Sequence, residues 1–172
     1  MTRQAMWVHG NAVVLRFPGG AGLSPYTSGH RMDGVLDGGS HAAWTDITGM
    51  HRDGGVTFRG IGGNTNSFQV SIPTPCWREF VRARLLMVAL LFTSDAQAII
   101  NGIRLFDGPN QMPFSFTSMN ISGAHLGLNS NVNRFDLPTP MNILWGLGIT
   151  IDVNFTQDGE ITFHALGADF DV

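Results

Sequence analysis

The sequence has no lysine, a single cysteine and few charged residues, and each shortage excludes something. Without lysine, this chain cannot supply a Schiff-base amine or a lysine general base. The single thiol, Cys76, cannot form an intrachain disulfide. The net charge of −3 gives no reason to expect a nucleic acid partner, because nucleic acids are bound through clustered cations.

Long hydrophobic runs are also missing. The longest apolar run, Leu85 to Phe92, is too short to cross a bilayer as a helix. The first ten residues lack the apolar core that a signal peptide needs. We therefore expect a cytoplasmic protein without membrane association.

Glycine and phenylalanine, in contrast, are plentiful: the chain has 22 glycines and 12 phenylalanines, and only 13% of its residues are charged. This composition predicts many short strands joined by tight turns. We expect one all-β domain over residues 1–172, a two-sheet antiparallel β-sandwich, jelly-roll-like, with about 8–10 strands. A surface so low in charge also predicts self-association.

The clearest predicted strand is Trp145 to Phe155, where six apolar residues alternate with small or polar ones. A turn at residues 157–159 and a second alternating run, Glu160 to Leu166, predict a hairpin. Trp7 to Phe17 alternates as well, with Trp7 and His9 on its inward face. Other predicted strands are Val56–Ile61, Ser67–Ile72, Ile99–Phe106, Phe114–Thr117 and Val132–Leu137.

The segment from Trp77 to Phe92 fits both a helix and a buried strand, since its apolar spacing agrees with either. We predict one helical turn at Cys76–Phe80 followed by a strand, because the neighbouring segments read as strands. Two similar Pro-Thr-Pro segments, Pro73–Pro75 and Pro138–Pro140, each follow a predicted strand. They predict places where a strand leaves its sheet or runs along an edge.

Five motifs occur in the order Trp7-Val-His-Gly-Asn-Ala-Val13, Ile72-Pro-Thr-Pro75, Phe106-Asp-Gly-Pro-Asn110, Trp145-Gly-Leu-Gly-Ile149 and Gly167-Ala-Asp-Phe170. In this ordered set the chain resembles an uncharacterised bacterial family of small single-domain proteins of unknown function. The resemblance spans nearly the whole chain and implies a stand-alone β-sandwich. It brings no catalytic residues. The Gly/His/Asp-rich segment at about 19–55, a predicted long loop, departs from the family's pattern.

That segment holds the candidate metal ligands, His30, His41 and His51, among several aspartates. Imidazole and carboxylate groups are what zinc, manganese and iron bind. The histidines are ten or eleven residues apart, however, and no His-x-His pair occurs, so no two ligands share one element. A solvated or subunit-contact loop is the preferred interpretation, and no cofactor is expected.

Other candidate site residues lie on predicted strands and asparagine-rich turns. His9 and Asp169 would form an acid–base pair if the C-terminal strands pack beside the N-terminal strand. For carbohydrate binding the candidates are Trp7, Asn64, Asn66, Asn129 and Asn131. Cys76 is interpreted as an inert thiol.

Three functions follow from these observations. The preferred one is a non-enzymatic binding or assembly module that forms a homo-oligomer. The second is a small lysine-free enzyme, of the cyclase, isomerase or lyase type, using histidine and aspartate in an apolar pocket. The third is a carbohydrate-binding module, whose ligand would be a glycan or another small molecule.

Overall fold

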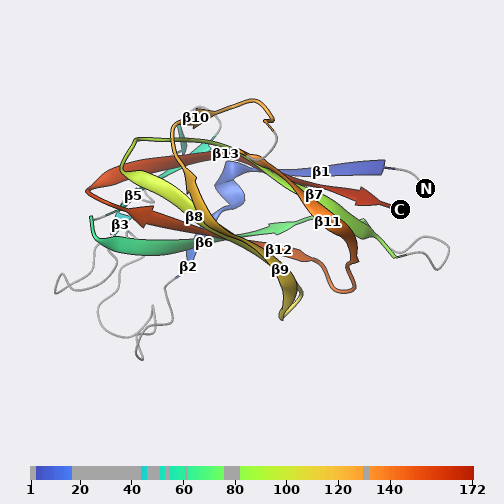
Figure 1. The fold of residues 1–172 in the computed structure, drawn as a ribbon. Helices are drawn as coiled ribbons and strands as arrows, with labels where there is room; N and C mark the ends of the chain where they lie inside the picture. Colours follow the sequence, from blue (N-terminus) through green and yellow to red (C-terminus); the bar gives the residue numbers. More distant parts are fainter. Residues whose placement is uncertain are drawn as a thin grey trace.

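The computed structural model describes residues 3–16, 44–45, 51–52, 55–60, 62–75, 82–129 and 132–172. In these residues two antiparallel sheets pack face to face (Figure 1). Sheet A contains β1 (Arg3–His9), β3 (Trp44–Thr45), β4 (His51–Arg52), β5 (Gly55–Gly60), β7 (Arg84–Ser94), β10 (Ala124–His125), β11 (Arg134–Asn142) and β13 (Gly159–Asp171). Sheet B contains β2 (Val14–Arg16), β6 (Asn64–Ile72), β8 (Ala98–Asp107), β9 (Asn110–Ile121) and β12 (Leu147–Phe155).

This arrangement confirms the predicted all-β, two-sheet sandwich. Nine of the thirteen described strands have six residues or more, which agrees with the predicted number of strands. The predicted loop at 19–55 lies largely outside the described residues, although β3 and β4 fall within it. In the described part of the chain, no helix has the length and apolar character needed to cross a membrane.

The longest strand of sheet A, β13, pairs with β7 along one side and with β5 and then β1 along the other. Because β1 runs antiparallel to the end of β13, the two chain termini lie side by side at one end of the sandwich (Figure 1). In sheet B the order is β2-β6-β12-β8-β9.

The predicted hairpin of residues 145–155 with 160–166 is wrong. β12 pairs with β6 and β8 in sheet B, whereas β13 lies in sheet A, so the turn between them carries the chain from one sheet to the other. Alternation places apolar side chains toward the core in either arrangement, because the core lies between the two sheets. The pattern therefore locates each strand without fixing its partner.

The predicted N-terminal strand, Trp7 to Phe17, is also broken. A 3-10 turn, η1 (Gly10–Ala12), separates β1 in sheet A from β2 in sheet B. Gly10 lies directly against the carbonyl oxygen of Phe163, where a Cβ would collide with the backbone. On β1, Met6 and Val8 pack against the core, so Trp7 and His9, which alternate with them, face outward; this corrects their predicted inward orientation.

The ambiguous segment is a strand from Arg84 onward, as predicted. The predicted turn at Cys76–Phe80 lies outside the described residues. β11 is an edge strand on β7, and its pairing register shifts between Asp136 and Met141, where Pro138 and Pro140 lack amide donors. The first proline pair follows the end of β6, so both Pro-Thr-Pro predictions are confirmed.

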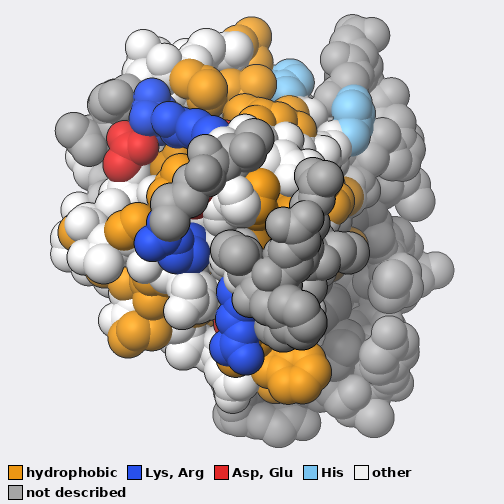
Figure 2. All heavy atoms as spheres, turned by 90° about the vertical axis from the view of Figure 1, so that its right-hand side faces the viewer, with side chains coloured by type: hydrophobic (Ala, Val, Ile, Leu, Met, Phe, Trp, Pro, Cys, Tyr) orange, Lys and Arg blue, Asp and Glu red, His pale blue; other side chains and the backbone are white. Residues whose placement is uncertain are grey.

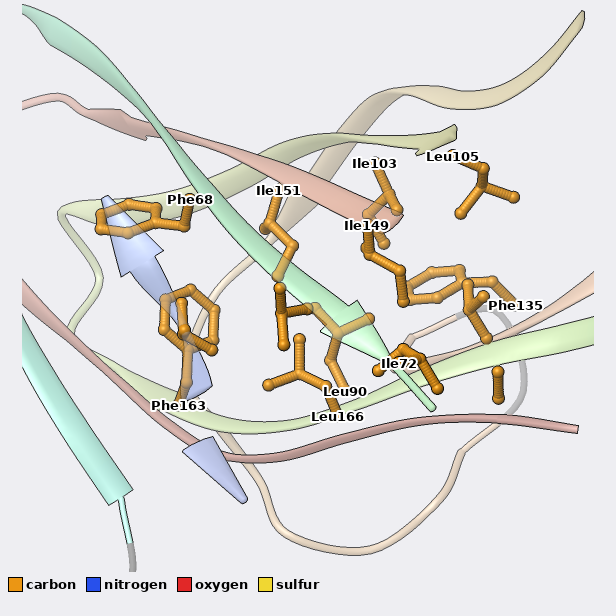
Figure 3. Packing of buried hydrophobic residues seen from close by; sticks show 14 of the residues in the cluster. Phe68, Ile72, Leu90, Ile103, Leu105, Phe135, Ile149, Ile151, Phe163 and Leu166 are labelled. Carbon is orange, nitrogen blue, oxygen red and sulfur yellow. The ribbon is translucent and has the colours of Figure 1, made fainter. Parts of the chain in front are cut away.

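The core fills the space between the sheets with side chains from both (Figure 3). Phe163 and Leu166 of β13 point toward Phe68 of β6 and Ile151 of β12. Five of the six apolar residues predicted to face inward on β12 are buried, from Leu147 to Phe155 in alternation. The inward faces are thus occupied, and the outer faces of the two sheets are left for polar residues.

Asn66 is a polar residue inside this apolar core. It was a candidate sugar-binding residue, but the structure places it away from the surface. It shares the inward face of β6 with Phe68 and Val70 and is fully buried. Neither its amide nitrogen nor its amide oxygen has a hydrogen-bond partner in the described part of the chain. A buried amide without partners costs about 1–3 kcal/mol.

Asn66→Val is therefore expected to raise the free energy of unfolding by about 1–3 kcal/mol, measured by chemical denaturation. Thr65→Val, on the exposed side of the same strand, is the matched control and is expected to change stability by less than about 0.5 kcal/mol. A loss of stability in Asn66→Val would contradict this account and indicate that the amide has a native partner.

Candidate functional site

A groove runs over the outer face of sheet B, and its volume is about 510 Å³. We call it the sheet-B groove. Its lining residues include Val14, Gln69, Ser71, Phe106, Gly148 and Thr150. Gln69, Ser71 and Thr150 face outward because they alternate with the core residues of β6 and β12. Val14 and Phe106 come from β2 and β8 of the same sheet. The groove surface is therefore neutral, with hydroxyl and amide groups beside one aromatic ring.

Glycine at position 148 keeps the floor of the groove open. An added Cβ at Gly148 would meet the Cβ of Phe106 at 3.5 Å, an ordinary contact, and otherwise project into the groove. Gln69 and Thr150 lie on neighbouring strands at this floor, with 3.4 Å between the Gln69 Nε2 and the Thr150 Oγ1. Thr150 is only 1% exposed, so the groove offers the amide of Gln69 and the hydroxyl of the exposed Ser71.

A charged cluster lies farther along the same face. Arg104 donates to both carboxylate oxygens of Asp152, at 3.0 and 2.7 Å, and Ser67 donates to Asp152 at 2.5 Å. The three residues come from β8, β12 and β6, which are adjacent in the sheet. A bidentate guanidinium–carboxylate pair is geometrically well defined, so this cluster holds the three central strands in a fixed relation.

One end of the groove is formed by the β8–β9 hairpin, whose tip is Gly108-Pro109. Gly108 has a φ of +56°, and its position would bring a Cβ within 2.7 Å of the Trp145 Cβ. Glycine is thus required at this position for both the turn and the close approach of Trp145. The loop that carries Trp145, residues 143–146, is packed on the hairpin tip.

Asp107 fixes that loop through its carboxylate. The backbone amides of Leu144, Trp145 and Gly146 all donate to it, at 3.0, 2.7 and 3.2 Å for its Oδ1. The amide of Leu147 donates to the Thr74 hydroxyl at 2.9 Å. Trp145 therefore stands on a fixed backbone while its side chain remains 76% exposed.

A second hollow, of about 420 Å³, lies on the other side of this loop. We call it the end hollow. It is lined by Thr74, Pro75, Arg82, Ala83, Ile143, Leu144, Trp145 and Gly146. Residue Asn142 at the end of β11 shares a row with Arg84, Asp171 and Arg3, so the end hollow lies toward the chain termini. Figure 2 faces this end of the molecule, where arginine side chains lie among hydrophobic ones and acidic side chains are sparse.

The structure does not form the predicted pair of His9 and Asp169. β1 does pack beside β13, as the prediction required, but the register puts His9 opposite Ala165 and Asp169 opposite Ala5. Four residues along a strand correspond to about 13 Å. Asp169 instead accepts from Arg3, 2.7 Å from its Nε, and His9 is exposed.

Trp7 is 39% exposed, but on the outer face of sheet A, away from both hollows. Its indole lies over Gly167 of the neighbouring strand, where a side chain would collide with the ring. The tryptophan thus covers a position without a side chain, an arrangement that stabilises glycine in a sheet. A role for Trp7 in ligand binding stays a prediction.

The asparagine candidates are dispersed. Asn64 lies at the far end of β6 from Trp145, and Asn131 is outside the described residues. Asn129 is part of a loop organised by Asn133, the last residue of the same asparagine-rich turn, which is fully buried. Asn133 accepts from the Asn129 amide at 2.7 Å and donates to the Gly127 carbonyl at 2.8 Å. Both asparagines therefore have structural contacts.

Two of the candidate metal ligands, His30 and His41, lie outside the described residues. The third, His51, is described only as a backbone position in β4. Within the described ranges, no three histidine, cysteine or acidic side chains gather as metal ligands would. His125 approaches the Ser122 carbonyl at 2.9 Å and His164 the Thr93 hydroxyl at 3.2 Å. Neither of these contacts involves a carboxylate.

Sequence reasoning also placed Trp145 wrongly. It was predicted to face the core at the start of a strand, yet β12 begins at Leu147 and the tryptophan is exposed. Gly146, with a φ of +135°, turns the chain between them. The glycine directly after the tryptophan was the available signal, since glycine marks a change of backbone direction.

No protein-family model matches the sequence, and no curated protein matches it. Among solved structures, the chain is similar to that of TmCBM61 in complex with beta-1,4-galactotriose. The match has 12% sequence identity, a TM-score of 0.37, and covers 96% of this chain and 86% of that chain. A likeness this distant carries no inference about ligand, and the family resemblance of the five motifs stays a prediction.

Removal of the Asp107 carboxylate is expected to loosen the Trp145 loop. Asp107→Ala should lower the free energy of unfolding by about 2 kcal/mol, since hydrogen bonds to a charged acceptor contribute about 1.5–3 kcal/mol. Hydrogen exchange at the amides of residues 144–146 should accelerate in the same variant. Asp136→Ala, at an exposed ion pair on sheet A, is the control. Unchanged exchange at 144–146 would show that Asp107 does not fix this loop.

Proposed function

We propose that this protein is a non-enzymatic binding module that takes a carbohydrate chain along the sheet-B groove and against Trp145. The observation that carries the proposal is an exposed indole, on a loop whose backbone amides donate to Asp107, at the end of a neutral groove of hydroxyl and amide groups. Sugars present both hydroxyl groups, which pair with such side chains, and apolar ring faces, which pack on an indole.

The rigidity of the site supports this proposal. Trp145 and the floor of the groove stand on strands and on a loop with three amides bonded to one carboxylate. A surface fixed in this way loses little conformational entropy when a ligand binds. Exposure of a tryptophan on a fixed loop has no benefit for folding, since burial of the ring would stabilise the fold more.

Binding is favoured over catalysis by the chemistry of the two hollows. Within the described residues, neither hollow is lined by a histidine or a carboxylate. General acid–base catalysis most often uses a histidine or a carboxylate within hydrogen-bond reach of the reacting atoms. The runner-up enzyme interpretation depended on His9 and Asp169, which the β1–β13 register separates.

The proposal is tested by filling the groove. Gly148→Val adds a side chain to the floor without backbone strain, and should weaken oligosaccharide binding by about tenfold or more with little change in stability. Trp145→Ala should weaken binding to a similar degree, because aromatic anchors carry much of the affinity of such sites. Isothermal titration calorimetry against a panel of neutral and acidic oligosaccharides measures both.

Gly127→Val is the matched control, since a Cβ there meets no atom within 4 Å and the loop lies by sheet A. Its affinity should equal that of the wild-type protein. The proposal fails if no oligosaccharide in the panel binds, or if Gly148→Val and Trp145→Ala bind as tightly as the control.

Self-association is a second proposal, favoured by β9. This strand ends sheet B and contains no charged side chain in its twelve residues. Charges and prolines commonly protect the free edge of a sheet against pairing with another chain. β9 has one proline, Pro113, and no charge, so the rest of its edge favours pairing between two copies.

Native mass spectrometry at micromolar concentration should then show a dimer. Thr117→Lys, a charge at an exposed position of β9, should shift the protein to the monomer, whereas Thr139→Lys, at an exposed position of β11, should not. A wild-type monomer under these conditions would contradict the assembly proposal and leave the binding proposal unaffected.

A further inference from the structure

We infer that the sugar bound at the end hollow carries an anionic substituent, a carboxylate or a sulfate, that pairs with Arg82. The inference rests on the proposed carbohydrate-binding function and specifies the class of sugar. The inference comes from the charged side chains around Trp145: the described lining of the end hollow includes an arginine, whereas that of the sheet-B groove is uncharged.

Arg82 differs from the other arginines whose side chains the structure describes. Arg3, Arg84, Arg104 and Arg134 are each paired with an aspartate, namely Asp169, Asp171, Asp152 and Asp136 respectively. Arg82 is exposed, and no ion pair or hydrogen bond holds its guanidinium among the described residues. Among the arginine side chains that the structure describes, Arg82 is thus the one whose charge no described carboxylate pairs.

The described residues around Arg82 offer its guanidinium no carboxylate partner. The described lining of the end hollow contains no acidic side chain. The nearby carboxylate of Asp107 is already occupied by the backbone amides of the Trp145 loop. An anion entering the end hollow would therefore reach the guanidinium without displacing any carboxylate of the described residues.

The other walls suit a sugar ring. Trp145, Leu144 and Pro75 present apolar surface to the same hollow that Arg82 lines. The volume of about 420 Å³ lies within the usual range of small-molecule sites, about 300–1,000 Å³. A planar guanidinium matches the two oxygens of a carboxylate or sulfate, so the ring can pack on the indole while its anionic group faces the arginine.

The sheet-B groove serves as an internal contrast. Its described cation, Arg104, lies beyond the groove and is neutralised by Asp152 in a bidentate pair. The neutral groove is therefore suited to neutral hydroxyl groups, and the end hollow to one charged group. A carbohydrate chain with one anionic sugar at the end nearest Trp145 would match both surfaces.

The test compares matched acidic and neutral ligands by isothermal titration calorimetry. The probes are a galacturonate hexamer, a mannuronate hexamer and a sulfated hexamer, each beside its neutral counterpart with the carboxylates reduced or the sulfates removed. Wild-type protein is compared with Arg82→Gln, which removes the charge and keeps a polar side chain. Arg134→Gln is the matched control, a charge removed from sheet A and away from the end hollow.

Wild-type protein is expected to bind at least one acidic hexamer about tenfold more tightly than its neutral counterpart, the usual effect of one charge-assisted contact. Arg82→Gln should abolish that preference, so that the acidic ligand binds no more tightly than its neutral counterpart, and Arg134→Gln should retain it. Preference for the uronates alone identifies a carboxylate, and preference for the sulfated hexamer alone identifies a sulfate.

Equal affinity for acidic and neutral ligands would overturn this inference and leave the proposed function in place. So would an acidic preference that survives in Arg82→Gln, or one that Arg134→Gln abolishes to the same degree, because the charge would then act at long range. No binding of any hexamer would overturn the proposed function together with the inference.

Discussion

The contact between aromatic rings of the two sheets is the constraint on which the rest of the structure depends. Phe68 of sheet B packs between Phe58 and Phe163 of sheet A, with ring centroids 4.7 and 5.3 Å apart. Phe116 and Phe135 join the sheets again at 5.2 Å. Because apolar faces must meet in this way, the chain repeatedly passes from one sheet to the other, as between β7 and β8. The connecting loops gather at the ends of the sandwich, and the outer faces remain available for polar residues.

The candidate site is a consequence of that division. The outward residues of β6 and β12 line a neutral groove, and the loop between β11 and β12 is placed at its end. The carboxylate of Asp107 accepts hydrogen bonds from the backbone amides of this loop, so its charge serves to stabilise the loop. Trp145 is presented on a fixed backbone between two hollows, one neutral and one with Arg82 as its charged group. Preorganisation of this kind favours binding because the free and bound surfaces are nearly the same.

Alternation in the sequence predicted where most strands lie, since burial of one face imposes period two on each strand separately. Alternation did not predict which strands pair with each other. β12 and β13 were expected to form a hairpin, but they lie in different sheets and have in common only that each turns one face to the same core. The site was less predictable for the same reason. Separation of His9 from Asp169 is a property of register, and exposure of Trp145 depends on Asp107, which is distant in sequence. Asn66 was chosen for its amide, although parity along β6 places it in the core.

Chemical-shift mapping of the isotope-labelled protein during titration with a mixture of neutral and acidic oligosaccharides tests the central claim most directly. The account predicts shifts concentrated at the outward residues of β6 and β12 and at residues 143–148, including the indole of Trp145. Shifts confined to the outer face of sheet A around Trp7, or a titration without shifts, would contradict it.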